Sequence, residues 1–265
     1  MKVIIPAAGY AKRLGKIVEN KPKHLLEVGG IPIIYHLILG IENLPIEDVY
    51  LVSNDKFYEQ FLNWKNSIKT RLNIKLINDG TRSNEDRLGT VGDIWFAIDK
   101  FGINDDLFII AGDNLYSDQT TRKYDLKGIY DAFLKLNRFS GIVGLYDVGD
   151  LDVARQMNSL TFFEDKIPSP GEYIQIKRLV EKDPNPISTI IAVMIEAYPR
   201  KIIDFFRKYI EKTDNHDRMG DFRAWLLNEG QIPIYGYLLN GKWFDIGLPE
   251  QLEEARRFYD NIKII

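Results

Sequence analysis

Apolar, strand-like runs alternate with helix-like segments through the first half of the chain, and this alternation limits the fold more than any other feature. Residues 2–6 form a continuous apolar run, as expected for a strand that is buried on both faces. Further strands are predicted at 48–53, 74–77, 106–111 and 141–148, and helices at 31–43, 56–70, 90–100 and 124–137. Such an alternation predicts an α/β fold with a mostly parallel sheet and helices on both of its faces.

The second half has a different pattern. Strands are predicted at 159–163, 173–180, 189–196 and 232–238, and helices at 199–209, 220–228 and 249–261. Because no long helix separates the first three of these strands, we expect an antiparallel extension that makes the sheet mixed. No linker rich in glycine, serine or proline divides the chain, so we expect a single domain, 1–265, with halves at 1–148 and 149–265.

Composition excludes several classes of protein. The net charge of −3 argues against broad nucleic-acid binding, which usually needs a basic face. The chain has no cysteine, so disulfides, thiolate metal sites and a cysteine nucleophile are excluded. No apolar run approaches the roughly twenty residues of a membrane span, and the first residues are typical of a strand rather than a signal peptide. We therefore expect a cytoplasmic protein without a membrane partner.

The loop after the first strand has the character of a phosphate-binding loop. Ala7, Ala8 and Gly9 are small enough to let a ligand approach the backbone closely. Five basic residues follow within twelve positions: Lys12, Arg13, Lys16, Lys21 and Lys23. The planar guanidinium of Arg13 and the mobile ammonium of Lys23 both suit phosphate oxygens. An ordinary surface loop that carries basic residues is the alternative.

Two aspartates are candidate metal ligands. Asp113 follows the strand 106–111, and ligands of parallel sheets bind at this carboxyl edge; a turn-capping role is the alternative. Asp245 lies among tryptophan, phenylalanine and isoleucine, where a carboxylate is costly unless it is paired or bound to a metal. Its alternative role is to stabilise the start of the helix 249–261. Two carboxylates would suit Mg²⁺, which completes its shell with water and phosphate oxygens.

Two weaker candidates follow from their positions. Glu181 and Lys182 end the strand 173–180 and could bind hydroxyl groups and a phosphate, although a solvated charge pair is the simpler interpretation. Gly89 and Thr90 enter the helix 90–100 and could contact the edge of a base. The hydroxyl of Thr90 is also expected to cap that helix.

The order of these motifs resembles that of the sugar-phosphate nucleotidyltransferases, among them the glucose-1-phosphate uridylyl- and thymidylyltransferases. The resemblance covers nearly the whole chain and rests on six motifs: Ala7-Ala8-Gly9 with Arg13-Leu14, Pro22-Lys23-His24-Leu25-Leu26, Leu88-Gly89-Thr90, Gly112-Asp113-Asn114, Val180-Glu181-Lys182 and Trp243-Phe244-Asp245-Ile246-Gly247. It implies a Rossmann-like sheet with a sugar-binding extension. It also implies that a nucleoside triphosphate, UTP or dTTP, reacts with a sugar 1-phosphate such as glucose 1-phosphate to give a nucleoside-diphosphate sugar and pyrophosphate.

The resemblance also implies a role for each candidate residue. The Mg²⁺ ligands would be Asp113 and Asp245, and the catalytic residues Arg13, Lys23, Lys182 and Asp113. The nucleotide would contact Ala7, Ala8, Gly9, Arg13, Lys23, Gly89 and Thr90, and the sugar phosphate Asn114, Glu181 and Lys182. The attacking phosphate oxygen is already ionised at neutral pH, so no general base is needed and catalysis reduces to alignment and charge neutralisation. A homo-oligomer is left open.

The chain departs from the family pattern in two places. Ala11 and Lys12 stand where the family usually has a glycine and a hydroxyl residue, so strain is expected if Ala11 takes a positive φ. We expect Lys12 to point into solvent. The family's tyrosine–glycine element is not evident near residues 153–156, which leaves the sugar unassigned.

Three other functions fit parts of this pattern. A cytidylyltransferase that acts on phosphocholine or an inositol phosphate would share the loop and the carboxylates. A non-catalytic regulatory subunit would bind a nucleotide sugar without turnover. A glycosyltransferase would show an Asp-x-Asp pair; Asp150 and Asp152 have that spacing, but we expect them to lie in a solvated turn.

Overall fold

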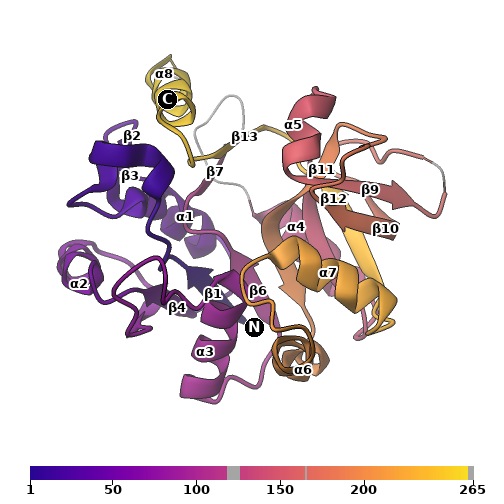
Figure 1. Cartoon of the computed structure of the whole chain (residues 1–265), viewed down its shortest axis with the longest axis horizontal. Helices are drawn as coiled ribbons and strands as arrows, with labels where there is room; N and C mark the ends of the chain where they lie inside the picture. The colour runs from indigo at the N-terminus through magenta and orange to yellow at the C-terminus, as the bar shows by residue number, and fades with distance from the viewer. Residues whose placement is uncertain (118–125, 165, 262–265) are drawn as a thin grey trace. The chain divides into compact units, whose positions relative to one another are not determined.

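The computed structural model describes residues 1–117, 126–164 and 166–261, which form two compact units (Figure 1). The first unit comprises Lys2–Leu88, Ile110–Lys127 and Gly241–Ile265, and the second unit comprises Met1, Gly89–Ile109 and Gly128–Asn240. Each unit is therefore assembled from segments that are far apart in the sequence. The predicted α/β class with a mixed sheet is confirmed.

The first unit is built on three parallel strands in the order β5-β4-β1. Two small antiparallel ribbons join it: β2 pairs with β3, and β7 pairs with β13. Its elements are β1 (Lys2–Pro6), the 3-10 helices η1 (Lys12–Val18) and η2 (Lys23–Leu25), β2 (Glu27–Val28), β3 (Ile31–Pro32), α1 (Ile33–Glu42), β4 (Asp48–Ser53), α2 (Tyr58–Ser67), β5 (Asn73–Asn78), β7 (Asn114–Ser117), β13 (Lys242–Asp245) and α8 (Pro249–Asn261).

One apolar cluster of the first unit contains side chains from near both ends of the chain. Helix α8 buries Leu252, Ala255 and Tyr259 in the same apolar cluster as Leu14 and Val18 of η1. Phe244 and Ile246, which flank Asp245, belong to this cluster as well. The same buried side chains therefore fix the short helix that carries Arg13 and the strand that carries Asp245.

The second unit carries mainly antiparallel strands in the order β6-β11-β8-β12-β10-β9, in which β12 and β8 are a parallel pair. Helices α6 and α7 pack through Phe206 and Phe222, whose rings stack with centroids 4.3 Å apart. Its elements are α3 (Thr90–Phe101), β6 (Leu107–Ile110), α4 (Lys127–Lys135), β8 (Gly141–Asp147), α5 (Leu151–Gln156), β9 (Asn158–Phe162), β10 (Tyr173–Glu181), β11 (Ile190–Tyr198), the 3-10 helix η3 (Arg200–Ile202), α6 (Ile203–Thr213), α7 (Met219–Asn228) and β12 (Ile234–Leu238). Strand β6 and helix α4 each extend one residue beyond the second unit.

Most predicted elements are present, with ends that shift by a few residues. The predicted helix 31–43 begins only at Ile33, because Ile31–Pro32 pairs with β2. Residues 124 and 125 of the predicted helix 124–137 lie outside the described residues. Asp150 and Asp152 are exposed, as predicted, but they do not lie in a turn. The Asp150 carboxylate instead caps α5 by accepting hydrogen bonds from the backbone N–H groups of Asp152 (2.7 Å) and Val153 (3.4 Å). No described helix has the length and hydropathy of a membrane span.

Candidate functional site

A buried asparagine, Asn54, fixes the loop after β1 through a hydrogen bond to its backbone. Asn54 Nδ2 donates to the carbonyl oxygen of Ala8 at 2.7 Å, and Asn54 Oδ1 accepts from the N–H of Phe57 at 3.0 Å. Gly9 at the tip is exposed, and a Cβ added there would meet no atom within 4 Å. The loop is thus fixed on its inner side and leaves open space at its tip. Asn54 was not predicted, although a lone asparagine directly after an apolar strand is a usable signal.

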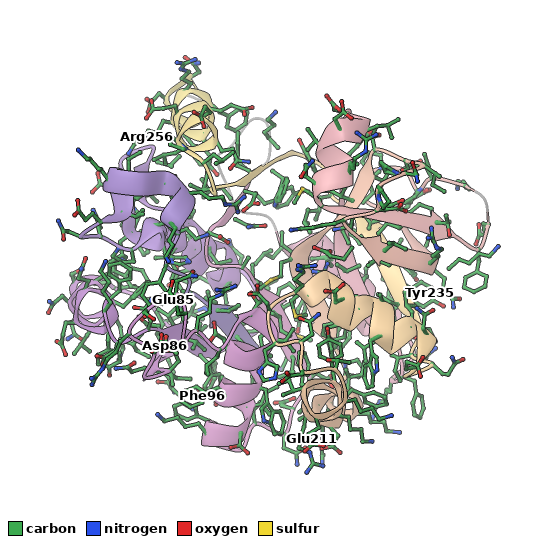
Figure 2. All side chains as sticks on the ribbon, viewed as in Figure 1. Glu85, Asp86, Phe96, Glu211, Tyr235 and Arg256 are labelled. Atoms are coloured by element: carbon green, nitrogen blue, oxygen red, sulfur yellow. The ribbon has the colours of Figure 1, made fainter. Side chains whose placement is uncertain are left out.

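Ala11 and Lys12 are the two positions at which the chain departs from the family pattern. Ala11 has φ 48° and ψ 37°, a left-handed conformation that an alanine rarely adopts. The expected strain is therefore present. Lys12 is exposed and pairs with the equally exposed Glu85 at 2.7 Å, on the loop where Figure 2 labels Glu85 and Asp86. Such a surface ion pair contributes little to stability.

Arg13 lies beside the strand end that carries Asp245. Its Nη2 is 3.4 Å from the position that a Cβ on Gly247 would occupy. The N–H groups of Gly247 and Leu248 both donate to Gln251 Oε1 at 2.9 Å, which fixes the turn between β13 and α8. Gly247 therefore leaves room for the guanidinium of Arg13, which also favours the ionised form of Asp245.

Asp113 and Asp245 converge on one asparagine. Strands β7 and β13 place Asn114 directly opposite Asp245. Asn114 Nδ2 donates to Asp113 Oδ1 at 3.1 Å and to Asp245 Oδ1 at 3.4 Å. The other oxygen of Asp113, Oδ2, forms a close ion pair with Lys23 Nζ. Gly112 precedes this group, and a Cβ there would lie 3.0 Å from side-chain atoms of His24 and Ile5.

The two carboxylates differ in how readily they ionise. Burial and, to a smaller extent, the nearby charge of Asp113 raise the pKa of Asp245 to about 6, against the opposing effect of Lys23 and Arg13. Burial alone would raise the pKa of Asp113, but the charges of Lys23 and His24 and the hydrogen bond from Lys23 together outweigh it, so the pKa of Asp113 is lowered. Negative charge is therefore in excess at the pair, and a cation would relieve it.

The donor set fits Mg²⁺. This ion usually takes one or two carboxylates from a protein, and this pair supplies two. Among the described residues, no cluster of three or more histidine, cysteine, aspartate or glutamate side chains could hold a metal without further ligands. The remaining ligands would have to be water and the oxygens of a bound phosphate, as the chemistry of Mg²⁺ favours.

Helix α3 begins differently from the prediction. Its N-cap is Gly89, with φ 79°, and Thr90 makes no side-chain capping hydrogen bond, so the predicted cap was wrong. The N–H groups of Val91 and Gly92 instead donate to the carbonyl oxygen of His216, at 2.9 and 3.1 Å, and that of Thr90 donates to Asp217 at 3.3 Å. A Cβ at position 89 would lie 2.5 Å from the His216 oxygen, so only glycine fits there.

Glu181 is the last residue of β10 and Lys182 directly follows it, so both lie at the end of a strand, as predicted. The Glu181 carboxylate lies against Gly220 in the first turn of α7, where a Cβ would collide with Oε2. Burial raises the pKa of Glu181, and the charge of Arg223 partly opposes this effect. Lys182 has φ 49°, and its N–H donates to the Met157 carbonyl oxygen at 2.7 Å. A non-glycine residue in this conformation is characteristic of a site where structure constrains a side chain.

A buried ion pair lies next to Glu181. Arg223 donates from Nε and Nη2 to the two oxygens of Glu196, at 2.9 and 3.1 Å. The Tyr198 hydroxyl donates to Glu196 Oε2 at 2.6 Å, and all three side chains are buried. Sequence reasoning missed this group. A charged residue inside the apolar run 190–198 was the available signal.

The structure thus distributes the predicted site residues over both units. In the first unit it brings together Arg13, Lys23, Asp113, Asn114 and Asp245, next to a loop formed by Ala7, Ala8 and Gly9. In the second unit, Gly89 and Thr90 begin α3, and Glu181 and Lys182 end β10.

The chain is similar to several known proteins. A family model described as nucleotidyl transferase matches residues 2–148. The bifunctional protein GlmU of Methanocaldococcus jannaschii is 27% identical over 97% of this chain and 54% of its own length. A probable mannose-1-phosphate guanylyltransferase 1 of Oryza sativa subsp. japonica is 32% identical over 98% of this chain and 64% of its own. The chain therefore spans less than two thirds of the length of each of these curated relatives.

Two solved structures share the fold. A putative glucose-1-phosphate thymidylyltransferase from Bacillus anthracis has a TM-score of 0.78 at 22% identity, over 99% of this chain and 96% of its own. A UDP-glucose pyrophosphorylase from Acinetobacter baumannii has a TM-score of 0.79 at 19% identity, over 99% of this chain and 95% of its own. At these identities the likeness shows the fold alone.

Proposed function

Because the chain belongs to the nucleotidyl transferase family, we propose that it transfers a nucleotidyl group from a nucleoside triphosphate to a sugar 1-phosphate. An oxygen of the sugar phosphate attacks the α-phosphorus, the bond between the α- and β-phosphates breaks, and pyrophosphate leaves. The attacking oxygen is ionised already, so no proton has to move. The products are a nucleoside-diphosphate sugar and pyrophosphate.

The observation that carries this proposal is the pair of aspartates that share Asn114. Asp113 and Asp245 would hold Mg²⁺. When bound, the ion supplies charge neutralisation between two anionic phosphates. Arg13 and Lys23 would hold the triphosphate and stabilise the departing pyrophosphate, since both are basic groups next to these carboxylates.

The second unit would bind the other parts of the substrates. The Lys182 ammonium would hold the sugar phosphate, and the Glu181 carboxylate would accept hydrogen bonds from sugar hydroxyl groups. Gly89 and Thr90 would contact the base. A cytoplasmic location and a homo-oligomer remain predictions from the sequence.

The substrates we propose are UTP or dTTP and a hexose 1-phosphate such as glucose 1-phosphate. GTP with mannose 1-phosphate is the second candidate, because a relative named as a mannose-1-phosphate guanylyltransferase is 32% identical.

The test is pyrophosphate release by the full chain in Mg²⁺. The four triphosphates UTP, dTTP, GTP and CTP would each be mixed with glucose 1-phosphate, mannose 1-phosphate, phosphocholine or an inositol phosphate. We expect release with a hexose 1-phosphate. Release only with CTP and a non-sugar phosphate would favour the cytidylyltransferase instead. Binding of a nucleotide sugar without any release would favour a regulatory subunit.

A further inference from the structure

The indole of Trp243 fixes which way the amide of Asn114 faces. Trp243 Nε1 lies 2.8 Å from Asn114 Oδ1, and both side chains are buried. An indole nitrogen can only donate a hydrogen bond, and of the two amide groups only the oxygen can accept one. The contact therefore holds Oδ1 toward Trp243 and leaves the NH₂ group on the opposite side.

That NH₂ group faces the two carboxylates. Asn114 Nδ2 reaches Asp113 Oδ1 at 3.1 Å and Asp245 Oδ1 at 3.4 Å. If the amide turned over, its oxygen would face two carboxylate oxygens and its NH₂ group would face an indole donor. Both contacts would then be repulsive. The indole thus selects the only amide orientation that reduces the repulsion between Asp113 and Asp245.

The strand register explains why these side chains meet. Asn114 is directly opposite Asp245 in the β7–β13 ribbon, and Trp243 precedes Asp245 by two residues. Residues two apart on a strand lie on the same face. Trp243 and Asp245 therefore lie on one side of β13, and diagonal neighbours in such a ribbon are within reach of a large aromatic side chain.

We propose that Trp243 and Asn114 are positioning residues for the carboxylate pair. They set Asp113 and Asp245 in the arrangement that accepts a divalent cation and need not contact a substrate themselves. This proposal rests on the proposed function for the identity of the cation site. It also gives Asn114 a different role from the substrate contact that the family resemblance implies.

The test is the affinity of the full chain for Mn²⁺ alone, measured by the loss of the free-ion signal in electron paramagnetic resonance. Trp243→Phe keeps an aromatic ring and removes the N–H. We expect the dissociation constant for Mn²⁺ to rise about tenfold, as for other groups that orient metal ligands. The Mg²⁺ concentration for half-maximal pyrophosphate release should rise with it.

Trp64→Phe is the matched control. Trp64 is also a buried tryptophan of the first unit, and its Nε1 has no hydrogen-bond partner in the described part of the chain. Its Mn²⁺ affinity should equal that of the wild type. Equal affinities in Trp243→Phe and the wild type would overturn the proposal, as would a wild type that binds no Mn²⁺.

A second variant keeps the test valid if Trp243→Phe does not fold. Asn114→Ala removes the amide, and we expect it to lose Mn²⁺ affinity at least as strongly. The double variant should match Asn114→Ala, because the indole acts through the amide. An unchanged affinity in Asn114→Ala would also overturn the proposal. A wild type that binds Mn²⁺ but releases no pyrophosphate from any substrate pair would instead overturn the proposed function.

Discussion

Each unit of the molecule contains a group of charges, half-buried in the first unit and buried in the second, and the two groups are balanced in opposite ways. In the second unit, both oxygens of Glu196 are paired with Arg223, and one also accepts from Tyr198. In the first unit, Asp113 and Asp245 lie close together, and only Asp113 has an ion-pair partner among the described residues. Removing one member of a balanced group destabilises a fold, whereas an unbalanced group is characteristic of a site that binds a ligand.

The pKa shifts follow the same division. Burial alone would lower the pKa of Arg223, yet the charge of Glu196 raises it above its ordinary value. Burial raises the pKa of Asp245, and its neighbour Asp113 adds to the effect. The charged state of Arg223 in the second unit is therefore favoured, whereas that of Asp245 in the first unit is opposed.

The largest change in stability is expected in the second unit, where the charges of Glu196 and Arg223 are fully paired. Arg223→Met would leave Glu196 buried without its partner, which should lower the free energy of unfolding by about 3–5 kcal/mol. Urea unfolding measures this free energy in the variant and the wild type. Arg155→Met is the control, since Arg155 pairs with Asp152 at the exposed surface, and should cost less than about 1 kcal/mol. Similar losses in both variants would contradict the comparison.

In the first unit, activity should fall while the fold persists. Asp113→Asn should lower the rate of pyrophosphate release by about 100-fold, because a preorganised charge is lost. Circular dichroism should remain that of the wild type. Asp152→Asn alters an exposed carboxylate of the second unit and should leave the rate unchanged. Wild-type turnover in Asp113→Asn would remove this residue from the metal site.

A glycine pair tests whether Glu181 binds the sugar. Gly220 and Gly128 are each the second residue of a helix, α7 and α4. A Cβ at 220 would displace the Glu181 carboxylate, whereas one at 128 would displace the Tyr237 hydroxyl. Gly220→Ala should raise the KM for the sugar 1-phosphate about tenfold through misplacement of Glu181, and Gly128→Ala should not. Equal KM values in the two variants would argue against this role.

Asp245→Asn should stabilise the metal-free protein at pH 7. A folded-state pKa above the unfolded value means that stability falls as pH rises through the interval between the two values. The pKa of Asp245 is raised from 3.8 to about 6. The loss of folding stability caused by its ionised carboxylate is therefore complete above pH 6 and absent below pH 4. At about 1.4 kcal/mol per pKa unit, the gain should be roughly 3 kcal/mol at pH 7 and vanish at pH 4, in urea unfolding with EDTA present. A variant less stable at pH 7 would show that the pair is already balanced.

Sequence patterns predicted the elements that depend on local periodicity. The strands 2–6 and 48–53 and the helix 249–261 have the predicted ends. Their apolar residues recur with the period of a strand or a helix, so the sequence alone indicates where each element begins and ends. The strands β7 and β13 were not predicted, since each has only four residues and is specified by a partner far along the chain. The division into halves at 1–148 and 149–265 stays a prediction.

The site was predictable only in part. The resemblance indicated Asp113 and Asp245, but no local pattern shows that Asn114 joins them or that Trp243 orients it across 129 positions. The left-handed conformation of Ala11 was predicted only as a condition, because the identity of a residue does not fix its φ. The cap of α3 depends on carbonyl groups of His216 and Asp217, which propensity at Thr90 does not reveal.

The β7–β13 ribbon also determines when the site can form. Asn114 and Asp245 are 131 positions apart, so a ribosome must complete most of the chain before the ribbon can close. Contacts of such long sequence separation form late and slow folding. A nascent chain that ends before residue 241 has the loop after β1 and Asp113 but lacks β13, α8 and their part of the core around Leu14. The proposed cation site therefore cannot be assembled before β13 has been synthesised.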